Sequence, residues 1–156
     1  MSEEERLVNA LTKKGYTITT AESCTGGLIS ATIVNAPGAS AVLNEAYVTY
    51  ANSSKEKLVG VSSETLETLG AVSEETARQM AEGAAKAAGA DVAISSTGIA
   101  GPGGGTKEKP VGLVYIGCYV KGSTKVVKCN FDGDRSEVRE KTVKTAISLA
   151  LKQLCL

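Results

Sequence analysis

The chain has 156 residues and a formal net charge of zero, and it is 42% hydrophobic and 22% charged. This length and balance suit one globular domain over 1–156 and exclude disordered, collagen-like and coiled-coil chains. Nucleic acid is not expected as a partner, because the chain has no cluster of basic residues and only 4% aromatic residues. A membrane is not expected either, because no apolar run approaches the ~20 residues of a membrane helix.

The first half of the chain predicts alternating helices and strands. A capping box and a closing glycine frame a helix over residues 2–14, and the β-branched run from Tyr16 predicts a strand. A short helix over TGGLISATIVN then ends at a Pro-Gly turn. EAYVTYA predicts a second strand from Glu45 to Ala51, and NSSKEKLVG predicts a turn or a short helix.

The second half adds helices, a buried strand and a hairpin. Serine N-caps predict helices over Ser63–Leu69 and Ser73–Ala88, and DVAISST predicts a strand buried on both faces. VGLVYIGCYV and STKVVKCNF meet at a Lys-Gly turn, which predicts an antiparallel hairpin. A long helix opens at Asp134, and its apolar face is expected at Val138, Val143, Ile147, Leu151 and Leu154.

This order of elements predicts an α/β domain, a three-layer α/β/α sandwich with a mixed, mostly parallel sheet. In such sheets ligands bind beyond the carboxyl ends of the parallel strands. Two loops with unusual composition follow predicted strands, TAESCTGG and SSTGIAGPGGG. Both are therefore candidates for a site.

The chain contains no histidine, which excludes Ser-His-Asp and Cys-His relays and histidine-containing zinc sites. Any general base must be Lys, Asp, Glu, Tyr or a terminus. The four cysteines, Cys24, Cys118, Cys129 and Cys155, form no CxxC pair, and the acidic start of the chain has no signal-peptide core. A reducing, cytoplasmic location is expected.

Ser23 is placed at the exit of the first predicted strand. The backbone N–H groups of Thr25, Gly26 and Gly27 would open the following helix and form an anion site, suited to a phosphate or to an oxyanion. The alternative is that Ser23 or Thr25 is only a helix N-cap, and the segment alone favours that alternative.

Cys24 is the rival nucleophile, because a helix N-terminus lowers the pKa of a thiol. Free cysteine is nevertheless usually buried, and no histidine can pair with it here. We expect Cys24 and the other three cysteines to be packing residues.

The glycine-rich loop after the third predicted strand favours close approach of its backbone to a ligand, although a flexible surface loop is the alternative. Its spacing matches neither a dinucleotide fingerprint nor a P-loop. Lys107 and Lys109 follow it and could pair with an anion or only face solvent. Arg135, at the start of the last helix, suits a phosphate or carboxylate, or a surface ion pair.

Tyr50 and Lys55 follow the second predicted strand and lie near the same sheet edge if that strand is parallel to the first. Lysine becomes a general base only where burial or nearby cations lower its pKa. On spacing alone Lys55 is an ordinary lysine at a helix start, and Lys57 is expected to face solvent.

Six blocks occur in one order over nearly the whole chain: TAESCTGGLIS, PGAS, YVTYANSSKEKLVGV, GAVSEETARQMAEGA, STGIAGPGGGTKEKPVG and FDGDRSEVR. Together they resemble the C-terminal domain of the competence-damage-inducible protein CinA, the fold of the stand-alone nicotinamide mononucleotide amidohydrolases. The chain is similar to the short, single-domain type. Ala46 and Ala51 stand where relatives usually carry glycine and serine, which bears on the loop beside Tyr50.

The resemblance implies hydrolysis of nicotinamide mononucleotide to nicotinic acid mononucleotide and ammonia, a salvage step for pyridine nucleotides that needs no metal or cofactor. It implies Ser23 as nucleophile and Lys55 as base, with Tyr50 and Thr97 orienting these groups. The TGG turn would hold the oxyanion. The loop glycines, Lys109 and Arg135 would hold ribose and phosphate, and the two loops could exchange roles. The loop glycines are Gly98, Gly101, Gly103 and Gly104.

Two alternatives remain open from the sequence. The same loops could bind another nucleotide or a small amide, and a non-catalytic regulatory module linked to competence or DNA damage is the second possibility. Relatives of this size suggest a homodimer or a larger homo-oligomer.

Overall fold

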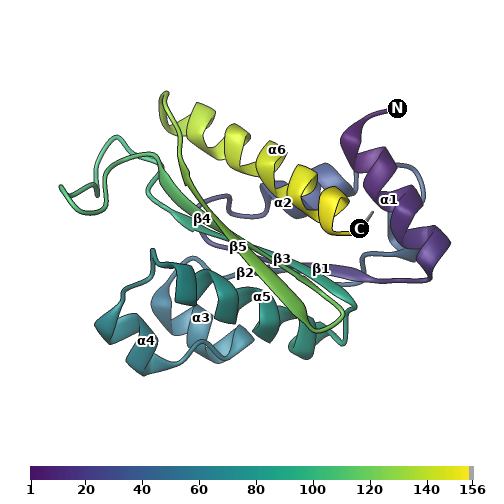
Figure 1. Cartoon of the computed structure of the whole chain (residues 1–156), viewed down its shortest axis with the longest axis horizontal. Coiled ribbons are helices and arrows are strands. Elements are labelled where there is room, and N and C mark those ends of the chain that lie inside the picture. The colour runs from purple at the N-terminus through teal and green to yellow at the C-terminus, as the bar shows by residue number, and fades with distance from the viewer. Residues whose placement is uncertain (155–156) are drawn as a thin grey trace.

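The computed structural model describes residues 1–154 and places helices on both faces of a five-stranded sheet (Figure 1). The elements in chain order are α1 (Glu3–Lys14), β1 (Ile18–Glu22), α2 (Leu28–Ile33), a 3-10 turn (Ala39–Ala41), β2 (Tyr47–Val48), α3 (Asn52–Val59), α4 (Ser63–Thr68), α5 (Glu74–Ala88), β3 (Val92–Gly98), β4 (Leu113–Val120), β5 (Ser123–Asn130) and α6 (Arg135–Leu154). Cys155, which the sequence assigned to packing, lies outside the described residues.

The strands lie in the order β2-β1-β3-β4-β5. β1 pairs with β2 and β3 in parallel, and the hairpin of β4 and β5 adds to β3 in antiparallel pairing. Within residues 1–154, β4 therefore runs against the other four strands. Helices α1, α2 and α6 cover one face of the sheet and α3, α4 and α5 cover the other (Figure 1). The predicted three-layer sandwich with a mixed, mostly parallel sheet is confirmed.

The helix starts follow from capping residues that the sequence displays. The side chains of Ser2, Ser62 and Ser73 each accept a hydrogen bond from the backbone N–H three residues further on. At the start of α6, Asp134 and Glu137 exchange such bonds reciprocally, as a capping box does. Because these bonds satisfy N–H groups that have no partner inside the helix, they fix where each helix begins.

Two predicted elements are clearly shorter in the structure. Helix α2 begins at Leu28 instead of Thr25, because Gly26 and Gly27 have φ angles of 56° and 108°, outside the right-handed helical region. The strand predicted over Glu45–Ala51 is reduced to Tyr47–Val48, which lies at the sheet edge and pairs only with β1 before the chain turns into α3.

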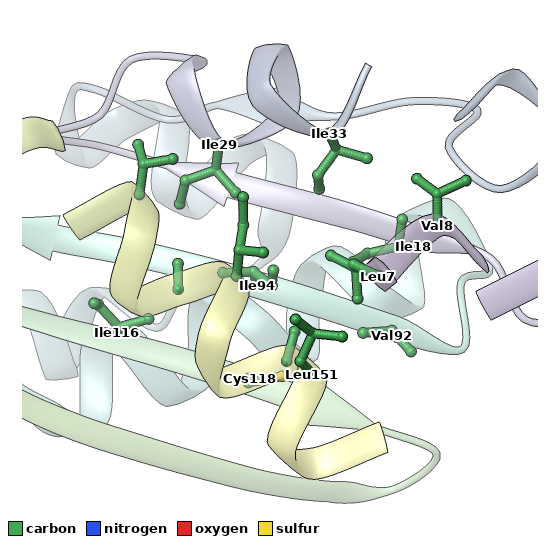
Figure 2. Close-up of a cluster of buried hydrophobic side chains, with 14 of the residues drawn as sticks. Leu7, Val8, Ile18, Ile29, Ile33, Val92, Ile94, Ile116, Cys118 and Leu151 are labelled. Atoms are coloured by element: carbon green, nitrogen blue, oxygen red, sulfur yellow. The ribbon is translucent and has the colours of Figure 1, made fainter. Parts of the chain in front are cut away.

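The larger hydrophobic core lies between the sheet and α1, α2 and α6. Figure 2 shows Leu7, Ile29 and Leu151 of these helices packed over Ile94 and Ile116 of the sheet. Full burial of each such side chain contributes about 1.5–3 kcal/mol. The predicted apolar face of α6 is confirmed, since Val138, Val143, Ile147, Leu151 and Leu154 are all buried.

A smaller core lies on the other face, where Ala21, Val59, Met80 and Ala93 join α3 and α5 to the sheet. β3 is buried on both faces, as predicted. None of the helices within residues 1–154 combines the length and the apolar character that crossing a bilayer requires.

Candidate active site

The carboxyl ends of β1, β2 and β3 meet at one edge of the sheet because the three strands are parallel. Ser23 follows β1, Tyr50 follows β2 and Thr97 lies near the end of β3, while α6 begins beside them. A cavity of about 270 Å³ lies at this edge. It is lined by Ser23, Cys24, Tyr50, Asn52, Lys55, Ala71, Val72, Thr97, Gly98, Ile99, Ala100, Gly101, Gly103, Gly104 and Arg135.

Ser23 and Lys55 meet in this cavity. The Nζ atom of Lys55 lies 3.1 Å from the Oγ atom of Ser23. The same Nζ donates to the backbone carbonyls of Thr49 at 2.9 Å and Tyr50 at 3.1 Å. Lys55 is only 1% exposed, so its amine is shielded from water. The two carbonyls keep the amine within hydrogen-bond distance of the Ser23 hydroxyl.

Burial lowers the pKa of Lys55 below its usual value, because desolvation disfavours the ammonium form. Among residues 1–154 no carboxylate forms an ion pair with Lys55 that would restore the charge. The amine can therefore be neutral at a lower pH than an ordinary lysine, which a general base requires.

Glu22 is the acid next in sequence to Ser23, but its carboxylate belongs to the other face of the sheet. Side chains alternate along a strand, so Glu22 points toward α2 while Ser23 points toward α3. The fully buried carboxylate of Glu22 accepts four hydrogen bonds. The donors are the hydroxyls of Thr20 (3.0 Å) and Thr25 (2.6 Å) and the backbone N–H groups of Ile29 (2.7 Å) and Ser30 (2.9 Å).

These bonds bear on the anion site predicted at the TGG turn. The N–H groups that open α2 donate to Glu22, so the protein's own carboxylate occupies the positive end of this helix. The N–H of Gly26 donates to the carbonyl of Ser23 at 3.1 Å. Thr25, Gly26 and Gly27 are not among the residues that line the cavity. Their assignment to substrate binding remains a prediction.

The expected packing role of the cysteines is confirmed for Cys24 and Cys118, which are buried. Burial raises the pKa of Cys24 to about 11 and that of Cys118 to about 12. Cys129 is half-buried, and burial raises its pKa as well. Cys24 lines the cavity, but its thiol is protonated near neutral pH and is a poor nucleophile in that form.

The glycine-rich loop forms one wall of the cavity, and Gly98, Gly101, Gly103 and Gly104 all belong to its lining. At Gly98 a Cβ atom would lie 2.6 Å from the side chain of Val114, so this position has no room for a larger residue. The hydroxyl of Thr97 donates to the carbonyl of Ala71 at 2.7 Å. Thr97 thus ties β3 to the loop before α5.

Arg135 closes the cavity from α6. Its guanidinium donates to the carbonyl of Gly101 at 2.8 Å and to the hydroxyl of Tyr50 at 3.2 Å. Tyr50 is 61% exposed, so it lies at the rim of the cavity. Lys109 is not part of the lining, because its Nζ donates to the carbonyl of Leu69 at 2.6 Å.

The sequence interpretation did not include Glu22 or Arg139. Arg139 of α6 donates from Nε to the carbonyl of Cys24 at 3.0 Å and from a terminal nitrogen to that of Thr25 at 3.2 Å. Its spacing of four residues from Arg135, which places both on one helix face, was the signal for it. For Glu22, the signal in the sequence was an acidic residue at the end of a predicted strand.

Comparisons with known proteins agree over the whole described chain. Residues 1–154 match the CinA C-terminal domain family. A CinA-like protein from Kosmotoga olearia is 54% identical over 151 residues, which are 97% of this chain and 37% of that protein. The chain thus spans little more than a third of the relative's length.

Solved structures are similar throughout. The competence/damage inducible protein CihA from Agrobacterium tumefaciens has a TM-score of 0.93 at 42% identity, covering 100% of this chain and 98% of that one. A competence-damaged protein (CinA) superfamily protein from Escherichia coli has a TM-score of 0.93 at 34% identity, covering 99% and 88%. With the sequence match over residues 1–154, these likenesses place the chain in the CinA C-terminal domain family.

Proposed function

We propose that this domain hydrolyses the carboxamide of nicotinamide mononucleotide to nicotinic acid mononucleotide and ammonia. The observation that carries the proposal is the 3.1 Å contact between the hydroxyl of Ser23 and the buried amine of Lys55. A serine beside a desolvated lysine is a nucleophile with its base, and it suits acyl transfer in a chain that contains no histidine.

In the first half of the reaction the neutral amine of Lys55 takes the hydroxyl proton of Ser23. The oxygen attacks the amide carbon, and the carbonyl electron pair moves to the oxygen to give a tetrahedral oxyanion. When this intermediate collapses, the C–N bond breaks and Lys55 returns the proton to the leaving nitrogen. Ammonia departs, and Ser23 carries the acid as an ester.

In the second half a water molecule replaces the amide nitrogen. Lys55 takes a proton from the water, the hydroxide attacks the ester carbon, and the bond to Ser23 breaks. The proton returns to the serine oxygen. The net change is one amide and one water converted to one carboxylic acid and one ammonia, so the dyad is regenerated.

The oxyanion requires N–H donors close to Ser23. Gly26 is not available, because its N–H donates to the carbonyl of Ser23. Within residues 1–154 the N–H of Thr25 donates to no protein acceptor, and we assign this role to it. The N–H of Gly27 also donates to no protein acceptor within residues 1–154, so Thr25 and Gly27 are the two amides of the TGG turn left for this role, and Thr25 is the nearer to Ser23 in sequence.

The cavity of about 270 Å³ is at the small end of ligand sites, which suits the pyridine ring and its carboxamide. The ribose and phosphate then lie toward the rim, where the glycine-rich loop and Arg135 are found. A guanidinium can bind phosphate oxygens through two parallel hydrogen bonds. Arg135 would exchange its bonds to Gly101 and Tyr50 for the phosphate.

Ammonia release from nicotinamide mononucleotide tests the proposal, with free nicotinamide as the control. We expect turnover of the nucleotide and little turnover of the free base, which lacks the phosphate that Arg135 would bind. Well-folded protein that releases no ammonia from the nucleotide would rule out nicotinamide mononucleotide as its substrate. It would favour a non-catalytic binding module or another substrate.

A further inference from the structure

The turn that carries the nucleophile is also held from α6. Arg139 is half-buried, and its guanidinium spans two successive carbonyls of this turn, those of Cys24 and Thr25. Arg139 is not among the residues that line the cavity. Its contact with the site therefore passes through the backbone next to Ser23.

Fixing a carbonyl also fixes the next N–H, because the peptide unit is planar and its C=O and N–H point in opposite directions. The bond from Arg139 to the Cys24 carbonyl thus sets the direction of the Thr25 N–H. The bond to the Thr25 carbonyl sets that of the Gly26 N–H, which in turn donates to the carbonyl of Ser23.

The opposite side of the turn is held by other groups. The hydroxyl of Thr25 lies 2.6 Å from the Glu22 carboxylate and 2.7 Å from the hydroxyl of Ser96. The N–H of Ser23 donates to the carbonyl of Ser96 at 3.0 Å. The turn is thus fixed between the sheet on one side and Arg139 on the other.

We propose that Arg139 is a positioning residue, which keeps the hydroxyl of Ser23 against Lys55 and holds the Thr25 N–H in place as the oxyanion donor. The second part rests on the proposed function. Arg139 acts through the turn and does not contact the substrate, so its loss should affect the chemical step and leave substrate binding unchanged.

The test uses Arg139→Met, which keeps an apolar stem and removes both donors, and Lys144→Met as the control. Lys144 is an exposed cation further along α6. We expect Arg139→Met to lower kcat on nicotinamide mononucleotide about 10- to 100-fold with KM unchanged, since a misplaced reacting group costs about that much. The kcat of Arg139→Lys should lie between those of the unaltered protein and Arg139→Met, because one ammonium cannot span both carbonyls as a guanidinium does. A kcat equal to that of Lys144→Met would overturn the proposal.

Amide hydrogen exchange of residues 23–28 gives a readout that needs no substrate. We expect faster exchange in this segment in Arg139→Met, with the α5 segment unchanged, and the same exchange as in Lys144→Met would overturn the anchoring role. If Arg139→Met does not fold, the exchange rates and kcat of Arg139→Lys decide. If the unaltered protein releases no ammonia, the proposed function fails, and exchange alone still decides whether Arg139 holds the turn.

Discussion

Glu22 and Ser23 are adjacent in sequence, but the side chain of Glu22 stabilises the fold while that of Ser23 lines the cavity. Glu22 and Ser23 follow each other at the end of β1, but strand alternation sends them to opposite faces. The Glu22 carboxylate is buried, and it accepts four hydrogen bonds from neighbouring groups of the fold. Lys55 is left without an acidic partner, and its burial then lowers the pKa of its amine.

Ser23 and Cys24 are adjacent candidates for the nucleophile, and single substitutions separate them. Ser23→Ala should lower kcat at least about a thousandfold, because the group that forms the covalent bond is lost. Cys24→Ala should keep a substantial rate, since burial raises the pKa of this thiol to about 11 and it stays protonated. The measurement is ammonia release per folded protein, with circular dichroism as the control. Loss of activity in the cysteine variant alone would contradict the assignment.

The lowered pKa of Lys55 predicts the form of the pH profile. Only the neutral amine can take the serine proton, and its fraction grows as pH rises through the pKa of Lys55. Because burial lowers this pKa, kcat/KM should rise with pH and level off at a lower pH than an ordinary, solvent-exposed lysine would require.

Two variants complete this measurement. Lys55→Met should abolish the rise together with the activity. Lys57→Met, which changes an exposed lysine of the same helix, should keep both. A profile that is flat, or that falls over the same range, would show that Lys55 is not the base.

At the scale of elements, the position of α3 decides where the amine of Lys55 lies. α3 packs mainly against α5, and Val59 of α3 also joins the core that includes Ala21 of β1. The two helices are in close contact at Gly83, where a Cβ atom would overlap the backbone carbonyl of Val59. Val59 lies one turn after Lys55 on α3. The lack of a side chain at Gly83 thus allows α3 to lie close against α5, one turn from Lys55.

Gly83→Ala tests this packing. In an isolated helix the change would stabilise by about 1 kcal/mol. Here the clash is with backbone that cannot rotate away, so we expect a net loss of about 1–3 kcal/mol in the free energy of unfolding. Activity should fall as well, because α3 must move and carry Lys55 from Ser23. Urea denaturation and ammonia release measure the two effects, and Ala87→Ser, at an exposed position of α5, is the control. A Gly83→Ala variant that is more stable and fully active would contradict this account of the packing between α3 and α5.

At the scale of the whole molecule, four distant segments meet at one edge of the sheet. Ser23 follows β1, while Lys55, Thr97 and Arg135 belong to α3, β3 and α6, and all four line one cavity. Parallel pairing of β1, β2 and β3 brings three of these segments together. The hairpin then returns the chain to the same edge, where α6 begins.

The sequence alone determined the elements and the layers, because helix caps, glycine stops and hydrophobic periodicity act over a few residues. It also predicted Ser23, the glycine-rich loop and, through resemblance, Lys55 as parts of a site, and the structure places all three around one cavity. Its expectations differed from the structure at the bounds of two elements. The short β2 follows from its place at the sheet edge, and the displaced start of α2 from the left-handed glycines.

Only the tertiary structure decided which polar groups were free for chemistry. A lysine four residues into a helix is ordinary until the packing of α3 against α5 buries it beside a serine 32 positions earlier. From the sequence alone, Glu22 could equally be a partner of Ser23. The structure shows instead that the Glu22 carboxylate accepts hydrogen bonds from the start of α2. The physical reason is that burial and hydrogen-bond competition set reactivity, and both depend on groups that are close in space and far apart along the chain.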